Sequence, residues 1–136
     1  MSERISKQVI VIRKDLNMRK GKMVAQGSHA VLKAILDLGH MHPNESGNSD
    51  IRFDIDHGTA LEDWLLGRFT KICVCVNSET ELIMIYEKAR SAKLICSLIT
   101  DAGLTEFNGV PTKTCCAIGP AWSDEVDPIT GHLTLL

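Results

Sequence analysis

The chain has 136 residues, of which 44% are apolar and 24% are charged, and its formal net charge is −2. These values are typical of one globular domain with a core of ordinary size. No apolar run approaches the roughly 18 residues that a transmembrane helix needs, and no signal peptide stands out. We therefore expect a cytoplasmic protein that does not enter a membrane.

Charge is distributed unevenly along the chain. Residues 1–33 contain eight Lys or Arg against two acidic residues, whereas the rest of the chain contains seven against fifteen. This asymmetry predicts one basic face that meets an anionic partner. The alternative is a run of charges that only meets water.

Five cysteines occur without a CxxC motif and without the spacing of a metal site: Cys73, Cys75, Cys96, Cys115 and Cys116. All lie in stretches that resemble strands, so we expect most of them to pack as small apolar side chains with reduced thiols. A nucleophilic role for Cys115 or Cys116 is the alternative.

The first predicted elements are a strand, a basic turn and a long helix. Residues 7–13 form a β-branched run that predicts a buried strand. Residues 15–21 predict a turn, and a helix is expected over 21–38. The helical period places four aliphatic residues on a face that we expect to be buried, namely Val24, Val31, Ile35 and Leu38.

The other face of this helix carries Lys22, Gln26 and His29 at i, i+4 and i+7. Such a row is either a solvated face or the floor of a site. Ser28 and His29 are adjacent and cannot face each other on a helix, which argues against a Ser-His-Asp triad.

Residues 40–58 change the character of the chain. Pro, Asn, Ser, Gly and Asp dominate there, which predicts an acidic surface-loop insertion in a single domain spanning 1–136. His40, His42 and His57 lie among aspartates in this stretch. No paired i, i+4 histidines fix a metal geometry, and we predict no metal site.

The second half alternates helices and strands. A short helix is expected over 59–67 and another over 79–92, each preceded by a capping box, with Thr59 and Ser78 as N-caps. Strands are expected over 70–76, 93–100 and 112–118, with a possible short strand over 132–136. This order predicts an α/β domain with a four-stranded mixed sheet, mostly parallel, flanked by helices on both faces.

Open α/β sheets bind ligands where strands end and helices begin. That rule places the 15–22 turn and the 101–105 turn at one edge of the sheet. Asp101 follows an apolar strand directly, and Thr112 and Thr114 share a face of the next strand. Asp is also a common turn residue and Thr a common strand residue, so each has a purely structural alternative.

Three segments of the chain resemble the type 2 peptidyl-tRNA hydrolases of archaea and eukaryotes: DLNMRKGKMVAQGSHA, DAGLTEF and TCCAIGPAWSDEVDPITGHLTL. They occur in the order typical of that family, with LEDW before the second strand, and the likeness extends from Lys7 to Leu136. The resemblance implies a compact α/β fold, often homodimeric, that hydrolyses the ester between a peptide and the 3′ end of tRNA. It implies no metal and no organic cofactor.

The resemblance also implies roles for particular residues. Its motifs align the family's functional positions with Lys22, Gln26, His29, Asp101, Thr105 and Thr114. Lys22 suits stabilisation of the developing oxyanion or contact with the terminal phosphate or ribose. His29 or Asp101 suits the role of general base, or that of orienting the water. Thr105 and Thr114 suit hydrogen bonds to water or ribose.

The partner implied is peptidyl-tRNA. Arg13, Arg19 and Lys20 on the basic face are expected to bind the acceptor-stem phosphates, and Gln26 is expected to bind the substrate as well. Leu104 stands where the family usually has Arg, which removes one cationic contact. A catalytically impaired tRNA- or protein-binding module of the same fold is therefore the alternative function.

Overall fold

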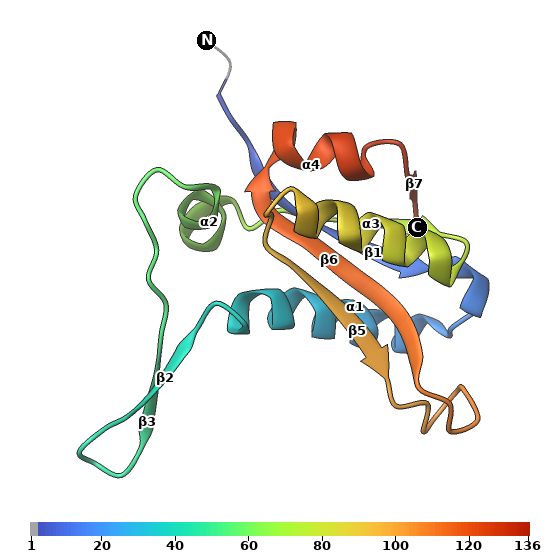
Figure 1. Ribbon diagram of the computed structural model, residues 1–136, viewed down its shortest axis with the longest axis horizontal. Coiled ribbons are helices and arrows are strands. Elements are labelled where there is room, and N and C mark those ends of the chain that lie inside the picture. The colour runs from blue at the N-terminus through green and yellow to red at the C-terminus, as the bar shows by residue number, and fades with distance from the viewer. Residues whose placement is uncertain (1–2) are drawn as a thin grey trace.

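A sheet in the order β5-β6-β1-β4-β7 forms the centre of the computed structural model, which describes residues 3–136 (Figure 1). Its strands are β1 (Ser6–Arg13), β4 (Lys71–Val76), β5 (Cys96–Asp101), β6 (Thr112–Trp122) and β7 (Thr134–Leu135). β1 and β4 pair in parallel, while β6 is antiparallel to both β1 and β5, and β7 is antiparallel to β4.

The prediction of four strands, mostly parallel, is therefore corrected to five strands with one parallel pair. The possible tail strand forms and covers the edge of β4. Helical crossovers give β1, β4 and β5 one common direction, as expected. However, a loop rather than a helix joins β5 to β6, so β6 returns antiparallel and lies between β5 and β1.

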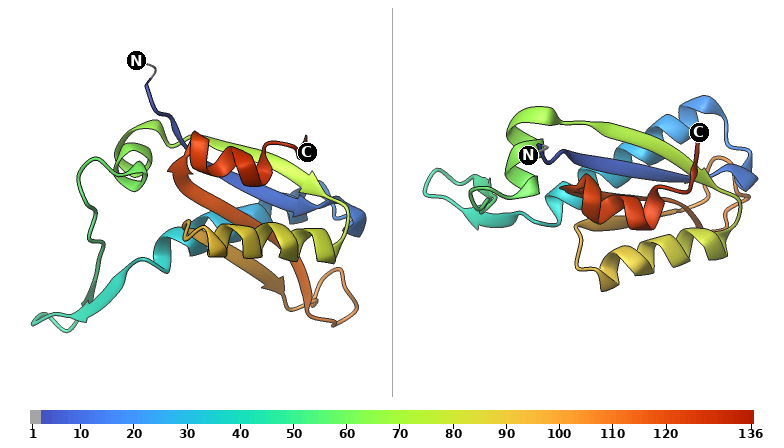
Figure 2. Two further views of the ribbon diagram at one scale, coloured as in Figure 1. Left: turned by 45° about the horizontal axis from the view of Figure 1, so that its top comes forward. Right: turned by 90° about the horizontal axis from the view of Figure 1, so that it is seen from above.

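Helices cover both faces of the sheet (Figure 2). α1 (Lys20–Leu36) packs on β5, β6 and β1, and α3 (Glu79–Ser91) and α4 (Ser123–Thr130) pack on the opposite face. A 3-10 turn, Lys14–Leu16, precedes α1. α2 (Ala60–Asp63) continues into the π-helical turn Trp64–Arg68.

Two buried clusters form the core, one on each face of the sheet. The larger joins Val9 and Val11 of β1 to Leu82 and Ile85 of α3. The smaller lies under α1 and includes Ile12 and Cys115. β1 contributes alternate side chains to the two clusters, as the two-residue period of a strand requires.

The buried face of α1 differs from the prediction. Its buried residues are Gln26, Gly27, Ala30 and Ala34, whereas Val24 is 70% exposed. The helix lies close to the sheet: a Cβ on Gly27 would be 3.5 Å from Ile10 Cγ2. Small residues therefore face the strands, and the larger aliphatic residues lie beside the contact.

Both predicted caps form. The Thr59 side chain accepts a hydrogen bond from the Glu62 backbone N–H, and that of Ser78 accepts one from the Glu81 N–H. Each satisfies an otherwise unpaired donor in the first turn of its helix.

Residues 40–58 form more than the predicted loop. β2 (His40–Pro43) and β3 (Ser49–Arg52) pair as an exposed antiparallel hairpin that projects from the rest of the molecule (Figure 1). His57 instead contacts Glu62, with 2.7 Å between Nδ1 and Oε2. Over residues 3–136, no three His, Cys, Asp or Glu side chains gather in a way that could hold a metal ion. No helix in that range is long and apolar enough to cross a bilayer.

Candidate active site

An ion pair joins the start of α1 to the end of β5. Lys22 Nζ lies 2.8 Å from Asp101 Oδ1 and 3.0 Å from Thr105 Oγ1, so one ammonium group contacts both residues. Gln26 Nε2 donates to the same Asp101 oxygen at 3.1 Å. The Lys22 and Asp101 side chains are each 13% exposed, so this ion pair is screened by water much less than one on the open surface.

A buried threonine holds the amide of Gln26. Thr114 Oγ1 donates to Gln26 Oε1 at 2.6 Å, and Thr114 is fully buried on β6. Because the amide oxygen is engaged there, the amide nitrogen faces Asp101. Lys22, Gln26, Asp101, Thr105 and Thr114 thus form one connected group, which we call the polar cluster.

Asp101 is held as a carboxylate. The hydrogen bond from Lys22, with further bonds from the Gly103 backbone N–H and from Gln26, lowers the pKa of Asp101 below its usual value. The Gly103 N–H lies 2.8 Å from Asp101 Oδ2, so the same carboxylate also shapes its own turn. The structural and functional explanations of Asp101 are therefore compatible.

Gly103 sets the path of the loop that carries Thr105. Its φ is +82°, and a Cβ there would overlap the backbone of Val110. The Gly109 N–H donates to the Gly103 carbonyl at 2.8 Å and closes the loop. From the sequence, only the aspartate of the DAG motif was expected to have a role in the site. The close approach of the Val110 backbone shows that the glycine is needed as well.

Phe107 and Glu106 were also missed by sequence reasoning. Lys22 Nζ lies 5.6 Å from the centroid of the Phe107 ring, which packs against the core under α1. Glu106 Oε1 accepts from Arg19 Nε at 3.0 Å. Both contacts tie the loop to the start of α1, and no sequence spacing could have predicted them because the two segments are more than 80 residues apart.

His29 does not join the polar cluster. It lies on α1 two turns after Lys22, and its side chain is exposed. Among the hydrogen bonds and ion pairs of residues 3–136, none links His29 to Lys22 or Asp101.

The three predicted phosphate-binding residues differ in availability. Arg13 contacts Asp15 at 2.6 Å and the Lys113 carbonyl at 3.0 Å, so its guanidinium joins the 3-10 turn to β6. Arg13 also lowers the pKa of Asp15 through this hydrogen bond. Arg19 is exposed despite its contact with Glu106, and Lys20 is exposed at the first turn of α1. These last two are the more accessible cations.

The cysteines are packing residues. Cys115 and Cys116 are fully buried. Burial raises the pKa of the Cys115 thiol to about 12 and that of Cys116 well above its ordinary value. Burial therefore disfavours a nucleophilic thiolate at either position.

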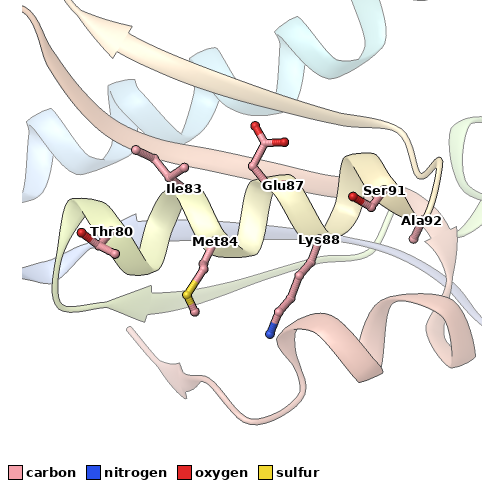
Figure 3. A pocket seen from close by; sticks show the side chains of 7 residues that line it. All are labelled: Thr80, Ile83, Met84, Glu87, Lys88, Ser91 and Ala92. Atoms are coloured by element: carbon pink, nitrogen blue, oxygen red, sulfur yellow. The ribbon is translucent and has the colours of Figure 1, made fainter.

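Two surface hollows are lined by no member of the polar cluster. One of about 710 Å³ follows the outer side of α3, where Glu87 and Lys88 point to opposite sides of the helix and no polar groups converge (Figure 3). The other, about 730 Å³, lies between α1 and the open part of the sheet and is mainly apolar; we call it the α1 groove. It is lined by Ile10, Ile12, Met23, Val24, Val31 and Cys73, among others.

The fold and the polar cluster together define an α/β protein whose site combines a fixed carboxylate, a fixed ammonium group and nearby cations. A model of the family "Peptidyl-tRNA hydrolase PTH2" matches residues 6–136. This match over nearly the whole chain shows that the chain belongs to the peptidyl-tRNA hydrolase PTH2 family.

Similar proteins agree with this assignment. The peptidyl-tRNA hydrolase of Methanocaldococcus jannaschii is 48% identical over 130 residues, covering 96% of this chain and 99% of the relative. That of Methanopyrus kandleri is 38% identical, covering 96% and 97%. A solved structure of a protein of unknown function from Agrobacterium tumefaciens aligns with a TM-score of 0.55 over 96% of this chain and 97% of that one. Its identity is 11%, so it supports the fold alone.

Proposed function

We propose that this protein hydrolyses the ester bond between peptide and tRNA in peptidyl-tRNA and so releases tRNA for reuse. Membership of the family and the names of the relatives support this activity. One observation supports assigning this activity to particular residues. It is the Lys22–Asp101 ion pair, which Gln26 and Thr105 contact at the end of β5.

Asp101 is proposed to accept the proton of the attacking water. A carboxylate offers about four acceptor sites, and three of those on Asp101 are used by Lys22, Gln26 and the Gly103 N–H. One therefore remains for a water molecule. As that water attacks the carbonyl carbon of the ester, its proton passes to Asp101 and a tetrahedral oxyanion forms.

Lys22 is proposed to stabilise the oxyanion. An ammonium group has three donors, and two of those on Lys22 contact Asp101 and Thr105. The third is available to the developing negative charge, an interaction that contributes about 3–4 kcal/mol in comparable sites. When the intermediate collapses, the carbonyl re-forms and the C–O bond to the ribose breaks. Asp101 returns the proton it accepted to the departing 3′ oxygen, so the products are a free carboxyl group and a tRNA with a free 3′ hydroxyl.

Gln26 and Thr114 act as positioning residues in this scheme. The buried Thr114 hydroxyl orients the Gln26 amide, which in turn donates to Asp101. His29 has no role in this mechanism, because it lies two turns of α1 away from Lys22.

The cations at the start of α1 are proposed to bind the acceptor stem. Arg19 and Lys20 are exposed beside the polar cluster, where tRNA phosphates would meet them, and Arg13 holds the turn that carries them. An enzyme acting on this substrate would work in the cytoplasm.

A homodimer is proposed through the apolar part of the α1 groove, which leaves Lys20, at the end of the groove where α1 begins, to the tRNA. Val24, Leu32 and Leu136 line this groove and are 70%, 57% and 49% exposed, an apolar area that a second copy would cover. Sedimentation of the wild type beside Val24→Asp would test it, with Met84→Asp on α3 as the control. A wild-type monomer, or a Val24→Asp dimer, would contradict the proposal.

The activity itself is tested with N-acetyl-aminoacyl-tRNA. We expect the purified protein to release the N-acetyl-amino acid in multiple turnovers, without added metal and after treatment with a thiol-alkylating reagent. A folded protein that binds the tRNA but releases nothing would instead be the impaired binding module.

A further inference from the structure

Two large apolar side chains are exposed on the loop that follows Asp101. Leu104 is 86% exposed and Val110 is 59% exposed. The backbones of Gly103 and Val110 are in close contact, so Leu104 lies near Val110 although five residues lie between them in the sequence. Single exposed leucines are common, but a pair beside a polar site gives a ligand an apolar surface.

The loop holds these side chains in place. Its ends pair through Asp101 and Thr112, and the Val110 N–H donates to the Phe107 carbonyl at 2.9 Å. Phe107 packs against the core, and Glu106 contacts Arg19, the residue directly before α1. Leu104 and Val110 are thus presented by an anchored segment, which lowers the entropy lost when a ligand contacts them.

The polar cluster lies next to this apolar surface and next to the cations. Leu104 directly precedes Thr105, which contacts Lys22. Arg19 and Lys20 stand at the start of α1, just before Lys22, and Arg19 also contacts Glu106 of the loop. The loop and the start of α1 lie at the same end of the molecule (Figure 1). A substrate with a polyanionic part and an uncharged acyl part would therefore meet both a cationic and an apolar surface next to the polar cluster.

We propose that Leu104, assisted by Val110, contacts the side chain of the amino acid esterified to tRNA and makes the enzyme favour apolar residues at that position. This inference rests on the proposed hydrolase function. It requires no contact between the loop and the tRNA body, so it predicts selectivity for the amino acid rather than a change in tRNA binding.

The test uses one tRNA body charged with either N-acetyl-leucine or N-acetyl-serine, and measures kcat/KM for each. We expect the wild type to favour the leucyl ester and Leu104→Ser to lose about 3- to 10-fold of that preference. This is less than the roughly 10- to 200-fold that one methylene contributes in a closed pocket, because Leu104 lies on an open rim. Leu104→Met, which keeps an apolar contact, should retain the preference.

Leu66→Ser is the matched control, because Leu66 is 73% exposed and belongs to the turn Trp64–Arg68 that continues α2. In Figure 1, α2 lies at the other end of the sheet from the loop between β5 and β6. It should leave both rates unchanged. Equal loss on the two esters in Leu104→Ser, or no loss on either, would overturn the inference while leaving the hydrolase intact. Failure of the folded wild type to cleave either ester would overturn the proposed function, and the inference with it.

Discussion

At the scale of single residues, the Lys22–Asp101 ion pair couples the site to stability. The lowered pKa of Asp101 means that the folded protein binds a proton there more weakly than the unfolded chain does. The pair therefore stabilises the fold at pH values above the ordinary pKa of Asp, about 3.9. This contribution is lost as the pH falls through the lower pKa of the folded state.

Asp101→Asn tests this linkage, because asparagine resembles the protonated carboxyl group. We expect the variant to be less stable than the wild type at pH 7, and the difference in free energy of unfolding to shrink below about pH 4. Urea unfolding at pH 7 and at pH 3 measures it. A difference that is the same at both pH values would show that the charge of Asp101 does not stabilise the fold.

Several residues of the site could be predicted from the sequence. Helical spacing was enough to place Lys22 and Gln26 on one face, and the rule for strand ends placed Asp101 at the same edge. The role of Thr114 could not be inferred without the packing of α1 on β6, which brings its hydroxyl to Gln26. His29 shares the helical face but is separated from Lys22 along the axis, a distance that angular periodicity does not report.

At the scale of elements, the loop between β5 and β6 depends on Gly103. We expect Gly103→Ala to displace the loop, since alanine at φ +82° is strained and its Cβ would meet the Val110 backbone. Because Thr105 moves with the loop, kcat should fall by at least about tenfold, as small displacements of positioned groups are costly.

Gly109→Ala is the control for this prediction. Gly109 has φ +76°, yet a Cβ there would meet no atom within 4 Å. It therefore reports the strain of positive φ without the collision. If both variants lost activity equally, backbone strain alone would explain the effect and the close approach of Val110 would be irrelevant.

The packing between elements also explains why the buried face of α1 was wrongly predicted. Hydrophobicity alone favoured Val24 and its neighbours, but the close packing of α1 on β1 admits only small side chains such as Gly27. Gln26 is buried because its amide finds partners on β5 and β6. The fit between surfaces, not the apolar period, decided which face turned inward.

At the scale of the whole molecule, the uneven charge of the chain predicts a salt-dependent affinity for tRNA. Each phosphate contact releases counterions, so the logarithm of the association constant should fall linearly with the logarithm of salt concentration. We expect Arg19→Ala and Lys20→Ala each to reduce that slope by about one. Filter binding with deacylated tRNA measures it.

Lys88→Ala on α3 removes the same charge from the opposite side of the sheet and should leave the slope unchanged. An affinity that does not change between low and physiological salt would contradict the proposed basic binding face.

The order of the strands in the sheet could not be predicted from the sequence. Helical crossovers predicted the common direction of β1, β4 and β5, but nothing local shows that β6 lies between β5 and β1. That placement depends on long-range packing of β6, whose residues Thr114 to Ala121 are all buried. The short β7 was predicted only as a possible strand, because two paired residues leave little pattern.

The most direct test of the central claim is the rate of ester release from N-acetyl-aminoacyl-tRNA by Lys22→Ala, Asp101→Ala and the double variant. Residues that act as one unit are not additive, so each single variant should lose about 10²-fold or more in kcat and the double variant little further. Lys33→Ala and Asp37→Ala, an exposed ion pair on the same helix, are the controls and should remain near wild type. Folded Lys22→Ala and Asp101→Ala proteins that keep the wild-type rate would contradict the assignment of catalysis to this ion pair.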